Sequence, residues 1–123
     1  MSRTVAVIGA SKNRHKFGNK ALRAFARQGY TVIPINPRET EIEGHQAYAS
    51  VLDVPGPIDM ATLYVPAQAG VRAIEELARK GVGEVWLNPG ADDDEVVERA
   101  RALGLKTIQA CSIMGIGDSP GRY

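Results

Sequence analysis

The sequence predicts an α/β fold, a doubly wound, five-stranded parallel sheet within a single three-layer domain. Short β-branched runs alternate with longer segments whose apolar residues recur at helical spacing. The runs are bounded by Gly, Pro and Asn turns and are too apolar for strands that leave one face in water. Because parallel crossovers are right-handed, this alternation of strand and helix favours a Rossmann-like sheet with helices on both faces.

The first half of the chain contains two expected strands and the first crossover helix. Thr4–Ile8 and Thr31–Ile35 are the two β-branched runs. Between them, Gly18–Gln28 places Leu22 and Phe25 on one face at helical spacing, with basic residues elsewhere. The pattern therefore predicts a helix that connects two parallel strands.

The second half repeats the same unit. Ala67–Lys80 reads as an amphipathic helix, and the pair Asp92 and Glu95 has the spacing of a capping box that begins a third helix ending at Gly104. The remaining expected strands are Asp59–Val65, Glu84–Leu87 and Leu105–Gln109.

Two segments do not follow this alternation. Glu39–Pro57 has little periodicity apart from a short helix expected at Tyr48–Leu52. Residues 115–123 are rich in Gly, Ser and Pro, and we expect them to form a flexible C-terminal tail after a domain that spans residues 1–114. No internal repeat or second domain is visible in the sequence.

Composition excludes several classes of function. Fifteen Lys and Arg against fourteen Asp and Glu leave a net charge of +1, which argues against a general nucleic-acid surface. No apolar run approaches the roughly 20 residues of a membrane span, and no signal peptide is apparent, so we expect cytoplasmic residence and no membrane partner. Protein partners and oligomeric state are left open by the sequence.

The end of the first strand and the loop after it carry the main functional signal. The turn Gly9-Ala10-Ser11 leads into a loop with Lys12, Arg14, His15 and Lys16, then Phe17 and Gly18 at the expected helix start. A glycine turn before a helix, with several cations, is typical of a phosphate-binding loop. The alternative is a simple turn whose basic residues face water.

The end of the second strand argues against NAD as the ligand. An NAD-binding chain places an acidic residue there for the ribose hydroxyls, whereas this chain has Asn36-Pro37-Arg38. Arg38 would suit a ligand with a phosphate on its ribose, because a guanidinium can pair with a phosphate in a bidentate manner. The alternative is a strand-ending turn in which Arg38 points to water.

Several motifs in order resemble the small stand-alone CoA-binding proteins, which are similar to the CoA-binding domain of the succinyl-CoA synthetase α subunit. They are Val7-Ile8-Gly9-Ala10-Ser11, Lys16-Phe17-Gly18-Asn19, Gly29-Tyr30, Pro34-Ile35-Asn36-Pro37, Tyr64-Val65-Pro66 and Trp86-Leu87-Asn88-Pro89-Gly90. The resemblance covers about residues 4–114 and implies that the ligand is coenzyme A or an acyl-CoA.

The resemblance also implies a division of roles. Gly9, Ala10 and Ser11 would approach the pyrophosphate, Asn36 and Pro37 would flank the adenosine end, and Tyr64, Val65 and Pro66 would line a second side. The predicted cofactor-binding residues are Gly9, Ala10, Ser11, Lys12, Arg14, Lys16, Phe17, Gly18, Asn36, Pro37, Arg38, Tyr64, Val65, Pro66, Asn88, Pro89 and Gly90.

No catalytic or metal-binding residue is predicted. His15 and His45 lack metal-ligand spacing, and Cys111 reads as a small buried side chain after the last strand. We therefore expect a CoA-binding protein without catalytic apparatus of its own. Two alternatives remain, an NADP-dependent reductase and a ligand-sensing regulatory module.

Overall fold

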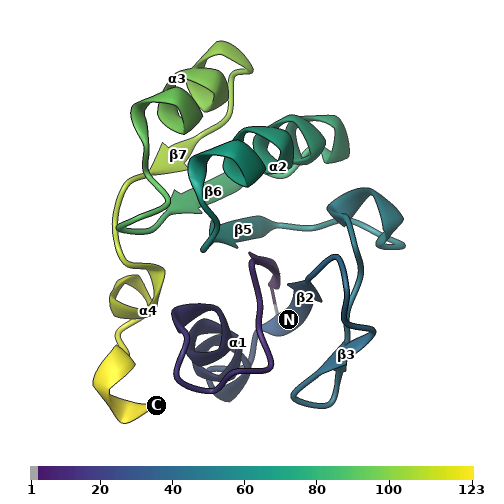
Figure 1. Ribbon diagram of the computed structural model, residues 1–123, viewed down its shortest axis with the longest axis vertical. Coiled ribbons are helices and arrows are strands. Elements are labelled where there is room, and N and C mark those ends of the chain that lie inside the picture. Colours follow the sequence, from purple (N-terminus) through teal and green to yellow (C-terminus); the bar gives the residue numbers. More distant parts are fainter. Residues whose placement is uncertain (1–2) are drawn as a thin grey trace.

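The computed structural model describes residues 3–123 and contains the expected five-stranded parallel sheet (Figure 1). The strand order is β2-β1-β5-β6-β7, with every neighbouring pair parallel. The strands are β1 (Thr4–Ile8), β2 (Thr31–Ile35), β5 (Met60–Leu63), β6 (Glu84–Leu87) and β7 (Thr107–Ile108). The predicted doubly wound α/β architecture is confirmed.

Helices cover both faces of this sheet and give three layers. The principal helices are α1 (Phe17–Arg27), α2 (Ala67–Lys80) and α3 (Asp94–Ala102), and α4 (Ser112–Gly115) is one short turn. The core under α2 and α3 includes Leu63 and Ile74, whereas the core under α1 and α4 includes Phe25 and Ile113. Figure 1 shows the same division, with α2 and α3 on one side of the sheet and α1 and α4 on the other.

The sheet order creates a crevice at the carboxyl end of β1. β1 pairs with β2 on one side and with β5 on the other. The chain therefore leaves the two central strands in opposite directions, and the loops after β1 and β5 separate above the sheet. Ligands of open α/β sheets bind at such a switch point.

The segment 39–57 differs from the expected loop with a short helix. It begins with a hairpin of β3 (Glu41–Ile42) and β4 (His45–Gln46), and a 3-10 turn at Val51–Asp53 follows. Tyr48 forms a bridge with Ile35 instead of starting a helix. Periodicity cannot reveal strands of two residues, so this hairpin was not predictable.

The start of α3 is a second correction. Its N-cap is Asp93, whose carboxylate accepts a hydrogen bond from the Glu95 N–H at 3.2 Å, rather than Asp92 as the capping-box spacing predicted. The carboxylate of Asp92 instead accepts a bond from the Gly90 N–H at 3.3 Å. Because Asp92, Asp93 and Asp94 are consecutive, more than one of them can serve as the N-cap. Asp92 bonds to the turn at Gly90, so Asp93 caps the helix.

The last nine residues contact the domain. Tyr123 donates a hydrogen bond to Asp118 at 2.6 Å, and the Arg23 guanidinium of α1 lies 5.3 Å from the centre of the Tyr123 ring. The C-terminal turn accordingly lies beside α1 in Figure 1. The expected mobility of residues 115–123 in solution stays a prediction. Within residues 3–123, no helix has the length and apolar character of a membrane span.

Candidate functional site

Gly9 lies at the centre of the crevice in a conformation that favours glycine. Its φ is +89°, and a Cβ at this position would lie 2.5 Å from the Tyr64 carbonyl oxygen and 2.8 Å from Val65 Cγ1. Gly18, at the start of α1, packs against the Gly9 carbonyl so closely that a Cβ would overlap it. Two glycines thus let the β1–α1 loop pass tightly between β5 and the helix.

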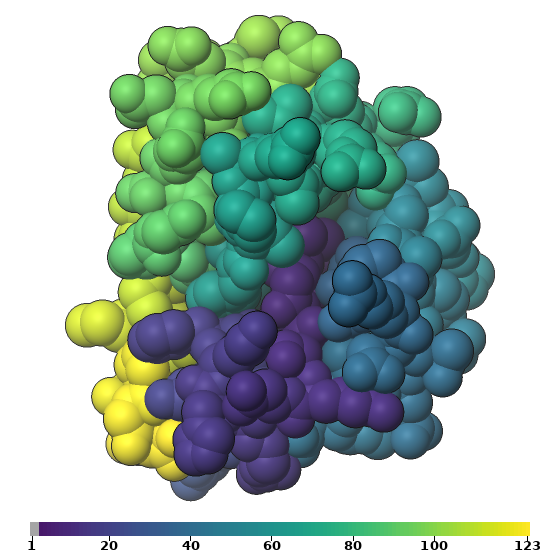
Figure 2. All heavy atoms as spheres, in the orientation of Figure 1, coloured from purple at the N-terminus to yellow at the C-terminus, as the bar shows by residue number. Residues whose placement is uncertain are grey.

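Two cavities meet at Gly9 and Val65. The first, here called the α1 cavity, has a volume of about 560 Å³ and lies against the start of α1. The second, the α2 cavity, has a volume of about 220 Å³ and lies against α2. Figure 2 shows the surface hollowed between α2 in teal and the residues after β2 in blue, with the purple N-terminal segment as its floor.

Most of the predicted site residues line the α1 cavity. Its lining is Gly9, Ala10, Ser11, Lys16, Phe17, Gly18, Asn36, Tyr64, Val65, Pro66, Pro89, Gly90 and Ala91. Of these, only Ala91 is absent from the predicted set. Pro37 lines the α2 cavity instead, whereas Lys12, Arg14, Arg38 and Asn88 line neither cavity.

The α2 cavity is largely aliphatic and was mostly missed by the sequence analysis. Its lining is Ile8, Gly9, Ile35, Pro37, Ala49, Val51, Val65, Ala69, Arg72, Ala73 and Glu76. One wall comes from the aperiodic segment 39–57, which carried no motif. The other wall is a face of α2, whose alanines resemble those of any helix that packs on a sheet.

Two of the basic loop residues are paired with acids that the sequence analysis did not connect to the loop. Lys12 Nζ lies 3.4 Å from a carboxylate oxygen of Glu39, and Arg14 donates to Glu43 at 2.8 Å. Glu43 follows β3 in a left-handed conformation, with φ of +51°. Lys16 forms no ion pair with the described residues and lines the α1 cavity. The positive charge available to a ligand is therefore smaller than the sequence indicated.

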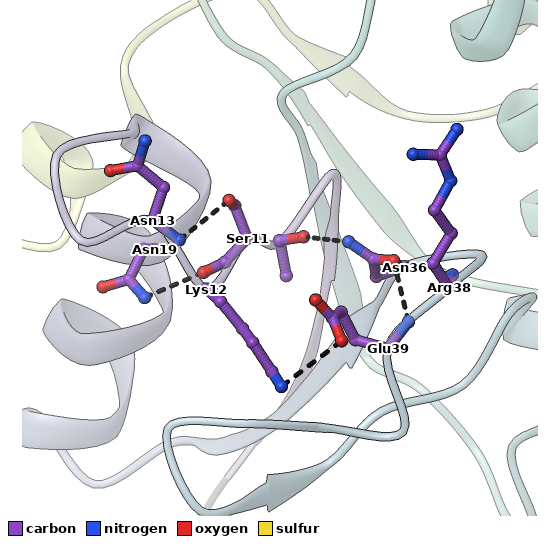
Figure 3. A network of polar contacts seen from close by, with 8 residues as sticks. Ser11, Lys12, Asn13, Asn19, Asn36, Arg38 and Glu39 are labelled. Atoms are coloured by element: carbon purple, nitrogen blue, oxygen red, sulfur yellow. Dashed lines mark hydrogen bonds and ion pairs between the residues drawn. The ribbon is translucent and has the colours of Figure 1, made fainter.

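The side chain of Asn36 links the β1–α1 loop to the residues after β2 by hydrogen bonds (Figure 3). Its side chain donates to the Ala10 carbonyl at 2.9 Å and accepts from the N–H groups of Arg38 and Glu39 at 2.8 and 3.0 Å. Figure 3 shows the Arg38 side chain directed away from Ser11. The residues after β2 and the β1–α1 loop are thus fixed relative to each other.

Asn19 also fixes the β1–α1 loop by hydrogen bonds, from the side of α1. Its amide donates to the Ser11 carbonyl at 2.8 Å and to Glu43 at 3.1 Å, and it accepts from Arg23 at 2.6 Å. The side chain is fully buried. Asn19 therefore links the loop, α1 and the β3–β4 hairpin.

Asn88 belongs to a buried hydrogen-bond network instead of the cavity surface. It donates to Thr62 at 2.6 Å and to the Leu63 carbonyl at 2.8 Å, and it accepts from the Ser112 N–H at 2.8 Å. The Ser112 hydroxyl in turn lies 3.1 Å from the Tyr64 hydroxyl. The predicted contact of the Asn88 side chain with a ligand thus has no geometric support, because the amide is occupied inside the protein.

The start of α1 leaves a place for an anion. The helix has no side-chain N-cap and no acidic residue in its first turn. Its first residues, Phe17 and Gly18, line the α1 cavity with Lys16. The unpaired N–H groups of a helix N-terminus and their partial positive charge favour an anionic group.

Tyr64, His15 and Cys111 carry side chains that are capable of acid–base or nucleophilic chemistry. Burial raises the pKa of the Tyr64 phenol, against the opposing effect of its hydrogen bonds with Ser112 and Thr62, so the phenol is protonated at neutral pH. His15 is exposed in the loop, and Cys111 is half-buried at the start of α4. Among residues 3–123, no group of three His, Cys, Asp or Glu side chains could hold a metal ion.

Comparison with known proteins points to one ligand class. A family model described as a CoA binding domain matches residues 3–117. The chain is 36% identical over 116 residues to the ADP-forming acetate–CoA ligase I of Archaeoglobus fulgidus, a match that covers 86% of this chain and 17% of the ligase. This chain therefore spans a small part of that relative.

Solved structures give the same relationship at the level of the fold. A hypothetical protein from Pyrococcus horikoshii OT3 matches with a TM-score of 0.87 and 28% identity, over 92% of this chain and 80% of that one. A conserved hypothetical protein from Pyrococcus furiosus matches with a TM-score of 0.83 and 31% identity, over 92% of this chain and 98% of that one.

Proposed function

The chain belongs to the CoA-binding domain family, with coenzyme A as its ligand, and we propose that the two cavities that meet at Gly9 divide this ligand between them. The adenosine end lies in the α2 cavity, the diphosphate crosses Gly9, and the pantetheine arm runs through the α1 cavity. The junction carries this proposal: Gly9 and Val65 line both cavities, so a ligand that extends across the two cavities passes over the Gly9 backbone.

The groups around the diphosphate fit this assignment. The uncapped start of α1 supplies backbone N–H donors, and Lys16 supplies a cation. The Ser11 hydroxyl oxygen accepts a bond from the Asn13 N–H at 3.0 Å, which leaves the hydroxyl hydrogen free to donate to a phosphate oxygen. These donors form the phosphate-binding loop of the proposed site.

The 3′-phosphate of the ribose is assigned to the rim of the α2 cavity. Arg72 of α2 lines this cavity, and Arg38 follows Pro37 on the opposite wall. Neither arginine forms an ion pair with another residue in the described part of the chain. In this proposal Arg72 would meet the phosphate from the cavity wall, and Arg38, which lies outside both cavities, would reach it from the rim beside Pro37.

We assign no reaction to this chain alone. The Tyr64 phenol is protonated at neutral pH and bonded to Ser112, so it is a poor general base. The ligase activity named for the archaeal relative belongs to a much longer protein. Binding of CoA or an acyl-CoA is thus the whole of the proposed activity, and cytoplasmic residence stays a prediction.

Calorimetric titration of the purified chain with CoA, NADP and NAD tests the function. We expect CoA to bind and to raise the melting temperature, since a ligand that binds only the folded state stabilises it by mass action. NAD should do neither at the same concentration. Stabilisation by NADP without any effect of CoA would refute the assignment.

Two lysines of the loop provide a matched pair of variants. Lys16→Ala is expected to weaken CoA binding about three- to tenfold, the effect of losing one partly solvated ion pair to a phosphate. Lys12→Ala should change affinity less, because the Lys12 ammonium lies beside Glu39 and outside both cavities. Equal losses in the two variants would argue against the proposed path of the diphosphate.

A further inference from the structure

The α2 cavity contains one carboxylate, that of Glu76, in an otherwise mostly aliphatic lining. Ser50, just before the 3-10 turn, donates its hydroxyl to Glu76 Oε1 at 2.7 Å. The oxygen of the same hydroxyl accepts from the Leu52 N–H at 3.0 Å, so its only hydrogen is directed to the glutamate. One carboxylate oxygen is thereby held in place.

The other oxygen, Oε2, is left as an acceptor. It has no hydrogen-bond or ion-pair partner among residues 3–123. Oε2 is reached by solvent in the cavity, and an occupant that displaces this water must supply a donor, because burying an unsatisfied carboxylate oxygen is costly. The cavity therefore favours a mostly apolar group that carries an N–H at its edge.

We propose that Glu76, oriented by Ser50, selects the base of the bound nucleotide by accepting a hydrogen bond from the 6-amino group of adenine. This inference rests on the proposed function, which assigns the adenosine end to the α2 cavity. A base with a carbonyl at position 6 would place two acceptors against each other. Guanine can satisfy a carboxylate through two adjacent N–H groups, but Oε1 is already occupied by Ser50.

The glutamine variant turns this acceptor into a donor. In Glu76→Gln the Ser50 hydroxyl still needs an acceptor and keeps the side-chain carbonyl oxygen, so the amide NH₂ takes the position of Oε2. We expect CoA to bind about tenfold more weakly to this variant. The analogue in which hypoxanthine replaces adenine should bind more tightly than it does to the wild type, because its 6-carbonyl can accept from the new amide.

Calorimetry with both ligands and four proteins tests the inference. The wild type should prefer CoA over the hypoxanthine analogue, and Glu76→Gln should reduce or invert that preference. Glu75→Gln is the matched control, because Glu75 is paired with Arg99 and lines neither of the two cavities. Ser50→Ala, which frees the carboxylate, should lower the preference several-fold without inverting it.

The outcomes separate this inference from the function on which it rests. If the wild type binds CoA without preferring adenine, or if Glu76→Gln weakens both ligands equally, Glu76 does not read the base. Should the wild type fail to bind CoA at all, both proposals fall. A changed ligand preference cannot come from a structural defect alone, since a damaged cavity would weaken both ligands in parallel.

Discussion

Gly9→Ala is expected to destabilise the protein itself, whatever its effect on ligand binding. A residue with a Cβ pays about 1–2 kcal/mol in the left-handed region that Gly9 occupies, with φ of +89°. The added Cβ would also lie 2.5 Å from the Tyr64 carbonyl oxygen, and such overpacking costs about 1–3 kcal/mol. We therefore expect the free energy of unfolding to fall by about 2–5 kcal/mol.

Gly29→Ala separates the two contributions. Gly29 has φ of +91°, but a Cβ there meets no atom within 4 Å, so only the backbone cost of about 1–2 kcal/mol applies. Urea denaturation of the wild type and both variants, with unchanged slopes, measures the difference. Equal losses in the two variants would refute the close packing of Gly9 against β5. If Gly9 were needed only to admit the ligand, Gly9→Ala would weaken CoA binding without this additional loss of stability.

Three further outcomes follow from the contacts described above. Asn88→Ala should lower the free energy of unfolding by about 2–4 kcal/mol in urea denaturation, because buried partners lose their hydrogen bonds at about 1–3 kcal/mol each; a loss under 1 kcal/mol would contradict the network. The Tyr123 hydroxyl and then the Ser119 N–H hold the pKa of Asp118 below its usual range, so the stability from this carboxylate is present above about pH 4 and disappears as pH falls through its lowered pKa. The melting temperatures of wild type and Asp118→Asn should therefore converge in acid, and a gap independent of pH would exclude this linkage. In calorimetry, Arg38→Ala should weaken the affinity for CoA about three- to tenfold and leave the affinity for 3′-dephospho-CoA unchanged. Equal effects on the two ligands would show that Arg38 does not contact the 3′-phosphate.

The centre of the sheet was predictable because β1 and β5 are buried on both faces. Thr31–Ile35 and Glu84–Leu87 have the bounds expected from the sequence, since an apolar run between turn residues has few other stable arrangements. The last strand is shorter than expected, Thr107–Ile108, because only these residues pair with β6. The β3–β4 hairpin was not predictable, since pairs of two residues leave no pattern.

The cavity against α1 was predictable for a similar reason. Its residues follow strand ends, and the carboxyl ends of parallel strands meet at one edge of the sheet. The α2 cavity was missed because Val51 and Glu76 lie in segments without such a motif. The internal bonds of Asn88 were not predictable, because a strand-end asparagine can bond either to a ligand or to the protein, and only the fold brings Ser112 within reach.

The pairing of the basic loop changes how phosphate recognition must work. A sequence with Lys12, Arg14 and Lys16 in one loop suggests binding by net positive charge, yet Glu39 and Glu43 neutralise two of these cations. The same contacts fix the loop, since Glu43 also accepts from the buried Asn19 amide at 3.1 Å. The two acids thus weaken the long-range attraction of the loop for anions, but they fix the loop and keep the direction of its N–H groups. Affinity for a diphosphate at this site then depends on the geometry of the helix start more than on the number of cations.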